Sequence, residues 1–155
     1  MKKLLLLLSL SVLLFASKNN IRPVDNVLYQ KECGSCHFAY QPELLPKRSW
    51  EKTMSTLQEH FKTDASLDET DTQTLLEYLT KNAPTNIRSL SASQTPLRIS
   101  DTPHFNKEHR KIPAKLISQK EVGSISNCIA CHRTADRGIY SERAINIPNY
   151  GGWDD

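Results

Sequence analysis

The sequence predicts a mostly α-helical protein with a large share of loop. Two segments, 49–61 and 66–81, place apolar residues on one face at the three- and four-residue spacing of a helix. No segment shows a convincing alternation of apolar and polar residues, which would mark a half-buried strand. Eight prolines, with many serines, threonines and asparagines, separate the periodic segments. We therefore expect short helices joined by long connections.

Residues 1–17 are typical of a secretory signal peptide rather than of a folded element. Two lysines precede an apolar run over residues 4–15, and two small residues, Ala16 and Ser17, follow it. The run is shorter than the roughly 20 apolar residues that a membrane-spanning helix needs. We expect cleavage near Ala16 or Ser17, export to the periplasm, and contact with a membrane only through this segment.

Two helices are predicted in the first third of the mature chain. The apolar spacing of residues 24–33 is compatible with a helix that Asp25 caps. A loop with two prolines separates it from a helix over 49–61, for which Ser49 is the expected N-cap. The buried face of this second helix is predicted to consist of Trp50, Met54, Leu57 and Phe61.

A third helix is predicted over 66–81, and Pro84 ends it. Ser66 is a suitable N-cap, and Glu69 three residues later completes a capping box. Residues 83–100 contain two prolines, many polar residues and almost no periodicity, which predicts a linker.

The last third of the chain is predicted to be smaller and more irregular than the first part. Residues 102–113 are bounded by prolines, a helix is predicted over 114–130, and residues 146–155 are typical of a loop. The resulting division is a signal peptide, a first unit, a linker and a second unit, over residues 1–17, 18–82, 83–100 and 101–155.

Net charge excludes two classes of partner. The chain has 20 Lys and Arg against 17 Asp and Glu, a formal net charge of +3. Loss of the two lysines in the signal segment leaves 18 basic against 17 acidic side chains, a net charge of +1. A nearly neutral protein has no electrostatic basis for binding nucleic acid or an anionic membrane.

The strongest chemical signal is a pentapeptide, Cys-x-x-Cys-His, that occurs twice and uses every cysteine of the chain. In this spacing the two thiols add to the two vinyl groups of one haem, and the adjoining histidine becomes an axial ligand of its iron. The sequence therefore predicts two covalently bound haem c groups. The residues concerned are Cys33, Cys36 and His37 in the first motif, and Cys128, Cys131 and His132 in the second.

Two other readings of the cysteine pairs are weaker. Paired Cys-x-x-Cys motifs can hold one structural zinc, but such sites are usually compact, whereas Cys36 and Cys128 are 92 residues apart. Disulfides or a thiol–disulfide active site are compatible with an exported protein. Neither reading explains why a histidine follows both pairs.

The mature chain is also poor in residues that form a core. Aromatic residues make up 7% of the sequence. Small domains with little apolar area usually need a cofactor or a cross-link. Two haems would supply the missing apolar mass, so we expect the haem-free chain to be largely unfolded.

The second axial ligands have few candidates, because five histidines are present and two belong to the motifs. For the first iron we favour His60 over Met54, since Met54 lies within the apolar stripe of its helix. For the second iron, spacing leaves His104 and His109 as alternatives. A methionine ligand would raise the reduction potential, and a histidine ligand would lower it.

Five short segments, several of them outside the two motifs, match the pattern of a known family. They are residues 29–40 around the first motif, Leu45-Pro46-x-Arg48-Ser49-Trp50, Leu57-x-x-His60-Phe61, Asp64-Ala65-Ser66-Leu67 and Phe105-x-x-x-His109-Arg110-x-Ile112-Pro113. Together they resemble the small di-haem cytochrome c family, across nearly the whole mature chain.

The resemblance implies a class-I-cytochrome-c-like first half and a smaller, irregular haem-binding second half. It also implies histidine at both axial positions of each iron, with His60 and His109 as the distal ligands. His104 falls where an aromatic residue is expected. Four cations are candidates for pairing with haem propionates: Lys47, Arg48, Arg98 and Arg110.

Irons with two histidine ligands have no vacant position for a substrate, so we expect electron transfer and no enzymatic activity. A quinol-linked donor or a membrane cytochrome b is the expected source of electrons. The resemblance implies a small haem protein or a reductase as acceptor. Two alternatives remain: a di-haem reductase or peroxidase with one open iron, and an electron-transfer subunit of a periplasmic reductase complex.

Overall fold

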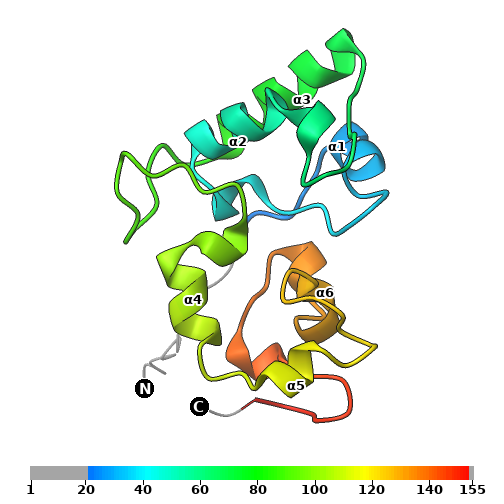
Figure 1. Cartoon of the computed structure of the whole chain (residues 1–155), viewed down its shortest axis with the longest axis vertical. Helices are drawn as coiled ribbons and strands as arrows, with labels where there is room; N and C mark the ends of the chain where they lie inside the picture. The colour runs from blue at the N-terminus through cyan, green and yellow to red at the C-terminus, as the bar shows by residue number, and fades with distance from the viewer. Residues whose placement is uncertain (1–20, 154–155) are drawn as a thin grey trace, which may run out of the picture.

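The computed structural model describes residues 21–153, and within that range it is helical with much loop. Six α-helices and five 3₁₀ helices follow one another in this part of the chain, together with three isolated β-bridges and no strand. Figure 1 shows α1, α2 and α3 in one group and α4, α5 and α6 in a second group below it. The prediction of a mostly α-helical chain with much loop is confirmed, while the predicted signal peptide lies outside the described residues.

The cap of the first helix, α1 (Val27–Glu32), lies one residue later than predicted. Asn26, not Asp25, caps it, because the Asn26 side-chain oxygen accepts a hydrogen bond from the Tyr29 backbone N–H at 2.8 Å. Tyr29 is buried, and its hydroxyl donates to the Tyr40 carbonyl at 2.9 Å. The helix ends at Glu32 with Cys33 as its C-cap, so it leads directly into the first cysteine pair.

The second helix, α2 (Lys47–Met54), is shifted and shorter than the predicted 49–61. It begins after Pro46, and Ser49 is buried inside it rather than capping it. It ends early because the hydroxyls of Ser55 and Thr56 both donate back to the Lys52 carbonyl, at 2.8 and 2.9 Å. A 3₁₀ helix, η2 (Leu57–Glu59), follows.

The third helix, α3 (Glu69–Asn82), also begins later than predicted. Asp68 caps it by accepting from the Asp71 backbone N–H at 2.8 Å, so the predicted capping box of Ser66 and Glu69 is wrong. Aspartate is as good an N-cap as serine, and the positive end of the helix dipole favours it further.

These three helices enclose the larger core of the molecule. Trp50, Met54 and Leu57 are buried as predicted, but Phe61, the fourth member of the stripe, is 41% exposed because the helix has already ended. The indole N–H of Trp50 donates to the Pro42 carbonyl at 2.8 Å. The buried cluster consists of Tyr29, Leu45, Trp50, Met54, Leu57, Leu75 and Leu79.

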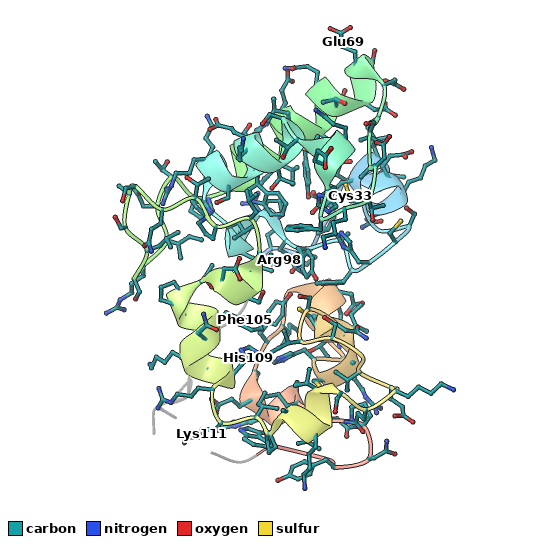
Figure 2. All side chains as sticks on the ribbon, in the orientation of Figure 1. Cys33, Glu69, Arg98, Phe105, His109 and Lys111 are labelled. Atoms are coloured by element: carbon teal, nitrogen blue, oxygen red, sulfur yellow. The ribbon has the colours of Figure 1, made fainter. Side chains whose placement is uncertain are left out.

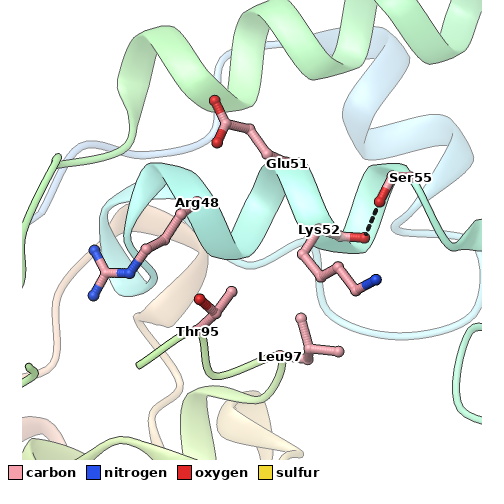
Figure 3. A pocket seen from close by; sticks show the side chains of 6 residues that line it. All are labelled: Arg48, Glu51, Lys52, Ser55, Thr95 and Leu97. Atoms are coloured by element: carbon pink, nitrogen blue, oxygen red, sulfur yellow. Dashed lines mark hydrogen bonds between the residues drawn. The ribbon is translucent and has the colours of Figure 1, made fainter. Parts of the chain in front are cut away.

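The segment after α3 is irregular up to a 3₁₀ helix, η3 (Ile99–Asp101). The Arg48 guanidinium fixes it on α2 by donating to three backbone carbonyls, those of Gln94 at 2.7 Å, Thr85 at 3.1 Å and Ser91 at 2.9 Å. An open groove of about 570 Å³ remains between α2 and Leu97 (Figure 3). Arg48 is thus engaged with the chain itself.

A fourth helix, α4 (Pro103–His109), occupies the stretch for which no helix was predicted. Thr102 caps it by accepting from the Phe105 backbone N–H at 3.3 Å, and the proline stands at the first helical position, where its missing N–H costs nothing. Pro103 therefore marks the start of a short helix, which ends at His109, and Pro113 lies four residues beyond that end.

The single helix predicted over 114–130 is wrong, because the structure has two four-residue helices, α5 (Ala114–Ile117) and α6 (Cys128–Cys131). The chain turns between them at Gly123, whose φ is +70°. The Asn127 side chain holds this loop by donating to the Val122 carbonyl at 2.9 Å. The second group has a smaller set of buried apolar residues, namely Phe105, Leu116, Val122, Ala135 and Ile147.

Candidate functional site

The structure places the ring of each motif histidine close to the ring of one other histidine. The ring centres of His37 and His60 are 6.1 Å apart, with an angle of 24° between the ring planes. The ring centres of His132 and His109 are also 6.1 Å apart, at 66°. Two imidazole nitrogens at about 2 Å from a shared iron would give ring centres roughly 6 Å apart, so both pairs fit one haem iron each.

The other two candidate ligands lie elsewhere. Met54 is 6% exposed inside the apolar core. The His104 side chain is 73% exposed, and its Nδ1 lies 3.8 Å from the Glu108 carboxylate on the same helix. The geometry therefore favours the histidine pairs that the sequence and the family resemblance suggested, with each pair formed within one group of helices.

The first site is built where α1 ends. Cys33 is the C-cap of that helix, and the chain turns through Cys36 to His37. The His37 Nδ1 lies 2.8 Å from the Phe38 carbonyl, so Nδ1 carries the proton and donates it, which leaves Nε2 as the nitrogen able to bind iron. Across from it, the Tyr40 ring centre is 5.3 Å from that of His37.

His60 stands on a tight turn rather than on a helix. The Thr63 N–H donates to the His60 carbonyl at 3.0 Å, and the two residues between them, Phe61 and Lys62, have positive φ values of 50° and 74°. The pKa of His60 is lowered, first by burial and then by His37 and Arg98 nearby. A lowered pKa keeps the imidazole neutral, as an iron ligand must be.

In the second site His132 follows α6 directly, and its backbone N–H donates to the Cys128 carbonyl at 2.7 Å. Burial, with a contribution from His109, lowers the pKa of His132 to about 4, so this ring is neutral at physiological pH. Its Nδ1 is buried without a hydrogen-bond partner. A buried ring nitrogen without a hydrogen-bond partner is unusual in a native protein core. Its presence next to two cysteines fits a site at which a further group binds.

His109 is held more firmly than His60. It lies in the last turn of α4, stacked on Phe105 with ring centres 3.8 Å apart and planes at 11°, and its Nδ1 is 2.8 Å from the Phe105 carbonyl. Figure 2 shows Phe105 and His109 on the side of α4 that faces α6. The pKa of His109 is lowered by burial, against which the Phe105 carbonyl acts.

The thiols themselves do not fit the zinc and redox alternatives. Burial raises the pKa of both Cys33 and Cys128 to about 11, whereas a redox-active cysteine has a lowered pKa. Within residues 21–153 there is no cluster of three or more His, Cys, Asp or Glu side chains that would hold a metal ion by itself. The donor set at each motif is two thiols and two imidazoles, which fits covalent haem.

Two tyrosines and a glutamine connect the sites, a role that no sequence motif predicted. Tyr40, beside His37, donates its hydroxyl to the Ser126 carbonyl at 2.7 Å in the second group. Tyr140, whose ring centre is 5.4 Å from that of His132, donates to the Gln41 side-chain oxygen at 2.6 Å in the first group. Gln41 is completely buried, and its amide N–H donates to the Ala135 carbonyl.

Three of the four cations predicted to pair with haem propionates contact other groups in the structure. The Arg48 donors are used by carbonyls, and Lys47 lies 3.8 Å from the Glu51 carboxylate. The Arg98 guanidinium stacks on the Phe61 ring, 3.7 Å from its centre. Arg110, the C-cap of α4, is exposed. Pairing with propionates stays a prediction for these cations.

The family model of dihaem cytochrome c matches residues 29–140, which is more than half of the chain. The chain belongs to the dihaem cytochrome c family. Membership of this family means that the protein carries two covalently bound c-type haems and that it is a cytochrome of the electron-transfer kind. No curated protein sequence matches the chain at a significant level.

Solved structures from two organisms are similar to this dihaem cytochrome c. The dihaem cytochrome c of Shewanella baltica is 38% identical, with a TM-score of 0.73, over 83% of this chain and 98% of that one. A dihaem cytochrome c of Rhodobacter sphaeroides is also 38% identical, with a TM-score of 0.72, over 77% of this chain and 100% of that one. A second structure from Rhodobacter sphaeroides is 40% identical, with a TM-score of 0.65, over 76% of this chain and 99% of that one.

The tyrosine–glutamine connection yields a stability prediction for the holoprotein. Burial raises the pKa of Tyr140, so its hydroxyl stays protonated and donates to Gln41. A Tyr140→Phe substitution leaves the Gln41 oxygen buried without its donor, and we expect the free energy of unfolding to fall by about 1–3 kcal/mol. Denaturant unfolding, followed by the absorption of the haems, measures it.

The matched control is Tyr150→Phe, which removes the same hydroxyl from a residue that is 58% exposed. We expect that variant to unfold within about 0.5 kcal/mol of the wild type. Equal losses in the two variants would show that the connection between the groups contributes nothing specific.

Proposed function

We propose that the protein is a periplasmic electron carrier in which both irons have two histidine ligands. His37 and His60 bind the first iron, and His132 and His109 bind the second. The thioethers form at the two cysteines of each motif, Cys33 and Cys36 in the first and Cys128 and Cys131 in the second. The observation that carries this assignment is the 6.1 Å spacing of both histidine pairs.

When bound, a haem supplies a one-electron change between ferric and ferrous iron, and the chain's own residues suit it to carriage rather than catalysis. The carbonyls of Phe38 and Phe105 fix the rings of His37 and His109 by accepting from Nδ1, so the ligating nitrogens are aimed in advance. A histidine opposite each motif histidine leaves no position for a substrate. Little has to move when the iron changes oxidation state.

We also propose a class-I-cytochrome-c-like arrangement for the first group. In support, α1 runs into the first motif and packs on α3, with the rings of Tyr29 and Tyr78 5.7 Å apart. Electrons would come from a quinol-linked donor or a membrane cytochrome b, and would pass to a small haem protein or a reductase. In residues 21–153 no helix has the length and apolar character to cross a bilayer.

Carbon monoxide tests the closed irons. It binds promptly to ferrous haem with a free axial position, so we expect the reduced protein to show no change in its haem absorption within seconds of mixing. Prompt binding at either haem would contradict the assignment of two histidines there and would favour an enzyme with an open iron. Cell fractionation after expression with residues 1–17 intact tests the location, since haem-containing protein retained in the cytoplasm would contradict export.

A further inference from the structure

The two distal histidines are supported in very different ways. His109 is part of α4 and stacks on Phe105, which is 8% exposed and belongs to the same helix. His60 is outside any helix, and its aromatic neighbour Phe61, with ring centres 4.8 Å apart, is 41% exposed. The first site therefore lacks the support that the helix gives the second.

The turn that carries His60 is also strained. Phe61 and Lys62 both have the left-handed backbone conformation that favours glycine, with φ values of 50° and 74°. A residue other than glycine is strained in this conformation, which persists only where the surroundings hold it. The hydrogen bond from the Ala65 N–H to the Leu57 carbonyl at 2.9 Å closes the base of this loop, but it lies away from the turn itself.

Arg98 supplies a contact at the turn. Its guanidinium carbon lies 3.7 Å above the centre of the Phe61 ring, which is the geometry of a cation–π interaction. Arg98 is well placed to hold another residue because its own backbone is fixed. Its carbonyl accepts from the Asp101 N–H at 3.1 Å, and the next residue, Ile99, packs against the core of the first group.

We propose that Arg98 is a positioning residue for the first iron site, which holds the strained turn through Phe61 and so keeps His60 on its iron. The inference rests on the proposed assignment of His60 as a ligand. It has a consequence for the whole molecule: of the two irons, the first is the one that exchanges its distal ligand for an external one. In that exchange the coordinate bond from His60 breaks and one from the incoming ligand forms, with no change in oxidation state.

The experiment measures displacement of the distal ligand in the reduced holoprotein by carbon monoxide over minutes to hours, followed by absorption. A His60→Ala variant, in which the first iron is open by design, provides the spectrum of carbon monoxide at that site. We expect the slow reaction of the wild type to produce that spectrum. In Arg98→Ala the first haem should react about three- to tenfold faster, while the second haem keeps the wild-type rate.

Two further variants separate this role from general effects. Arg88→Ala removes an equal charge from the same exposed segment and should leave both rates unchanged. Lys62→Gly relieves the left-handed strain, so it should slow displacement at the first haem and should partly offset Arg98→Ala when the two are combined. Opposite effects of Lys62→Gly and Arg98→Ala on the displacement rate distinguish control of the turn from general destabilisation of the fold.

Several results would overturn the inference. They are an Arg98→Ala rate equal to that of the wild type, equal acceleration at both haems, the same acceleration in Arg88→Ala, or a Lys62→Gly variant that reacts as fast as the wild type. If His60→Ala creates no promptly reacting haem, the ligand assignment itself is wrong. If His60→Ala does open the first iron and Arg98→Ala has no effect, only the role of Arg98 fails.

Discussion

A His109→Ala variant is expected to convert the second haem into an open iron that binds carbon monoxide promptly. His109 is the ring that faces His132 at 6.1 Å, and nothing else on α4 replaces it there. Loss of one histidine ligand also removes electron density from the iron, so its reduction potential should rise, by an amount on the order of 100 mV. Redox titration and carbon monoxide mixing measure both effects, and the first haem should keep its properties.

His104→Ala is the matched control, because it removes the same side chain from the same helix five residues earlier. Its ring is 73% exposed and points toward Glu108 rather than toward the second motif. We expect both haems of that variant to behave as in the wild type. If His104→Ala opened the second iron and His109→Ala had no effect, His104 would replace His109 in the ligand assignment.

The chemistry of this protein was far easier to predict from sequence than its helix limits. The motif from Cys33 to His37 is local, and covalent attachment depends only on that spacing, so no knowledge of the fold was needed. Spacing alone did not decide between His104 and His109, because that choice depends on which face of α4 meets α6. The family resemblance supplied what the helix geometry later supports.

The errors in the helices have a common physical origin. Helix α2 ends at Met54 because two hydroxyl side chains bond backward to Lys52, although the apolar spacing continues to Phe61. The helix predicted over 114–130 fails because Gly123 and the bond from Asn127 turn the chain. Side-chain hydrogen bonds to the backbone decide these limits, and apolar periodicity does not report them.

The contacts between the two groups could not be predicted at all. Gln41 bonds to residues about 100 positions later in the chain, Ala135 and Tyr140, and a buried glutamine next to a proline carries no signal of such partners. The hydrogen bonds from Arg48 to three backbone carbonyls could not be predicted either. From the sequence, Arg48 was only one of several cations expected near a haem.

Removal of the second haem is expected to unfold the second group of helices while the first group stays folded. In a Cys128→Ala, Cys131→Ala double variant neither thioether can form at that site. The three helices there have seven, four and four residues, all below the length at which a helix is stable alone, and the group has five buried apolar residues. The haem is thus the largest apolar body available to that part of the core, and without it the ordering entropy of the segment is not offset.

The matched variant is Cys33→Ala with Cys36→Ala, which removes the first haem instead. The first group keeps the 14-residue α3 and a core of seven buried residues that includes Trp50, so we expect more of it to survive. Hydrogen exchange should show lost protection over 101–153 in the first double variant, and a smaller loss over 21–82 in the second. Native-like protection of 101–153 without haem would contradict the argument, because it would mean that the protein side chains alone suffice as a core.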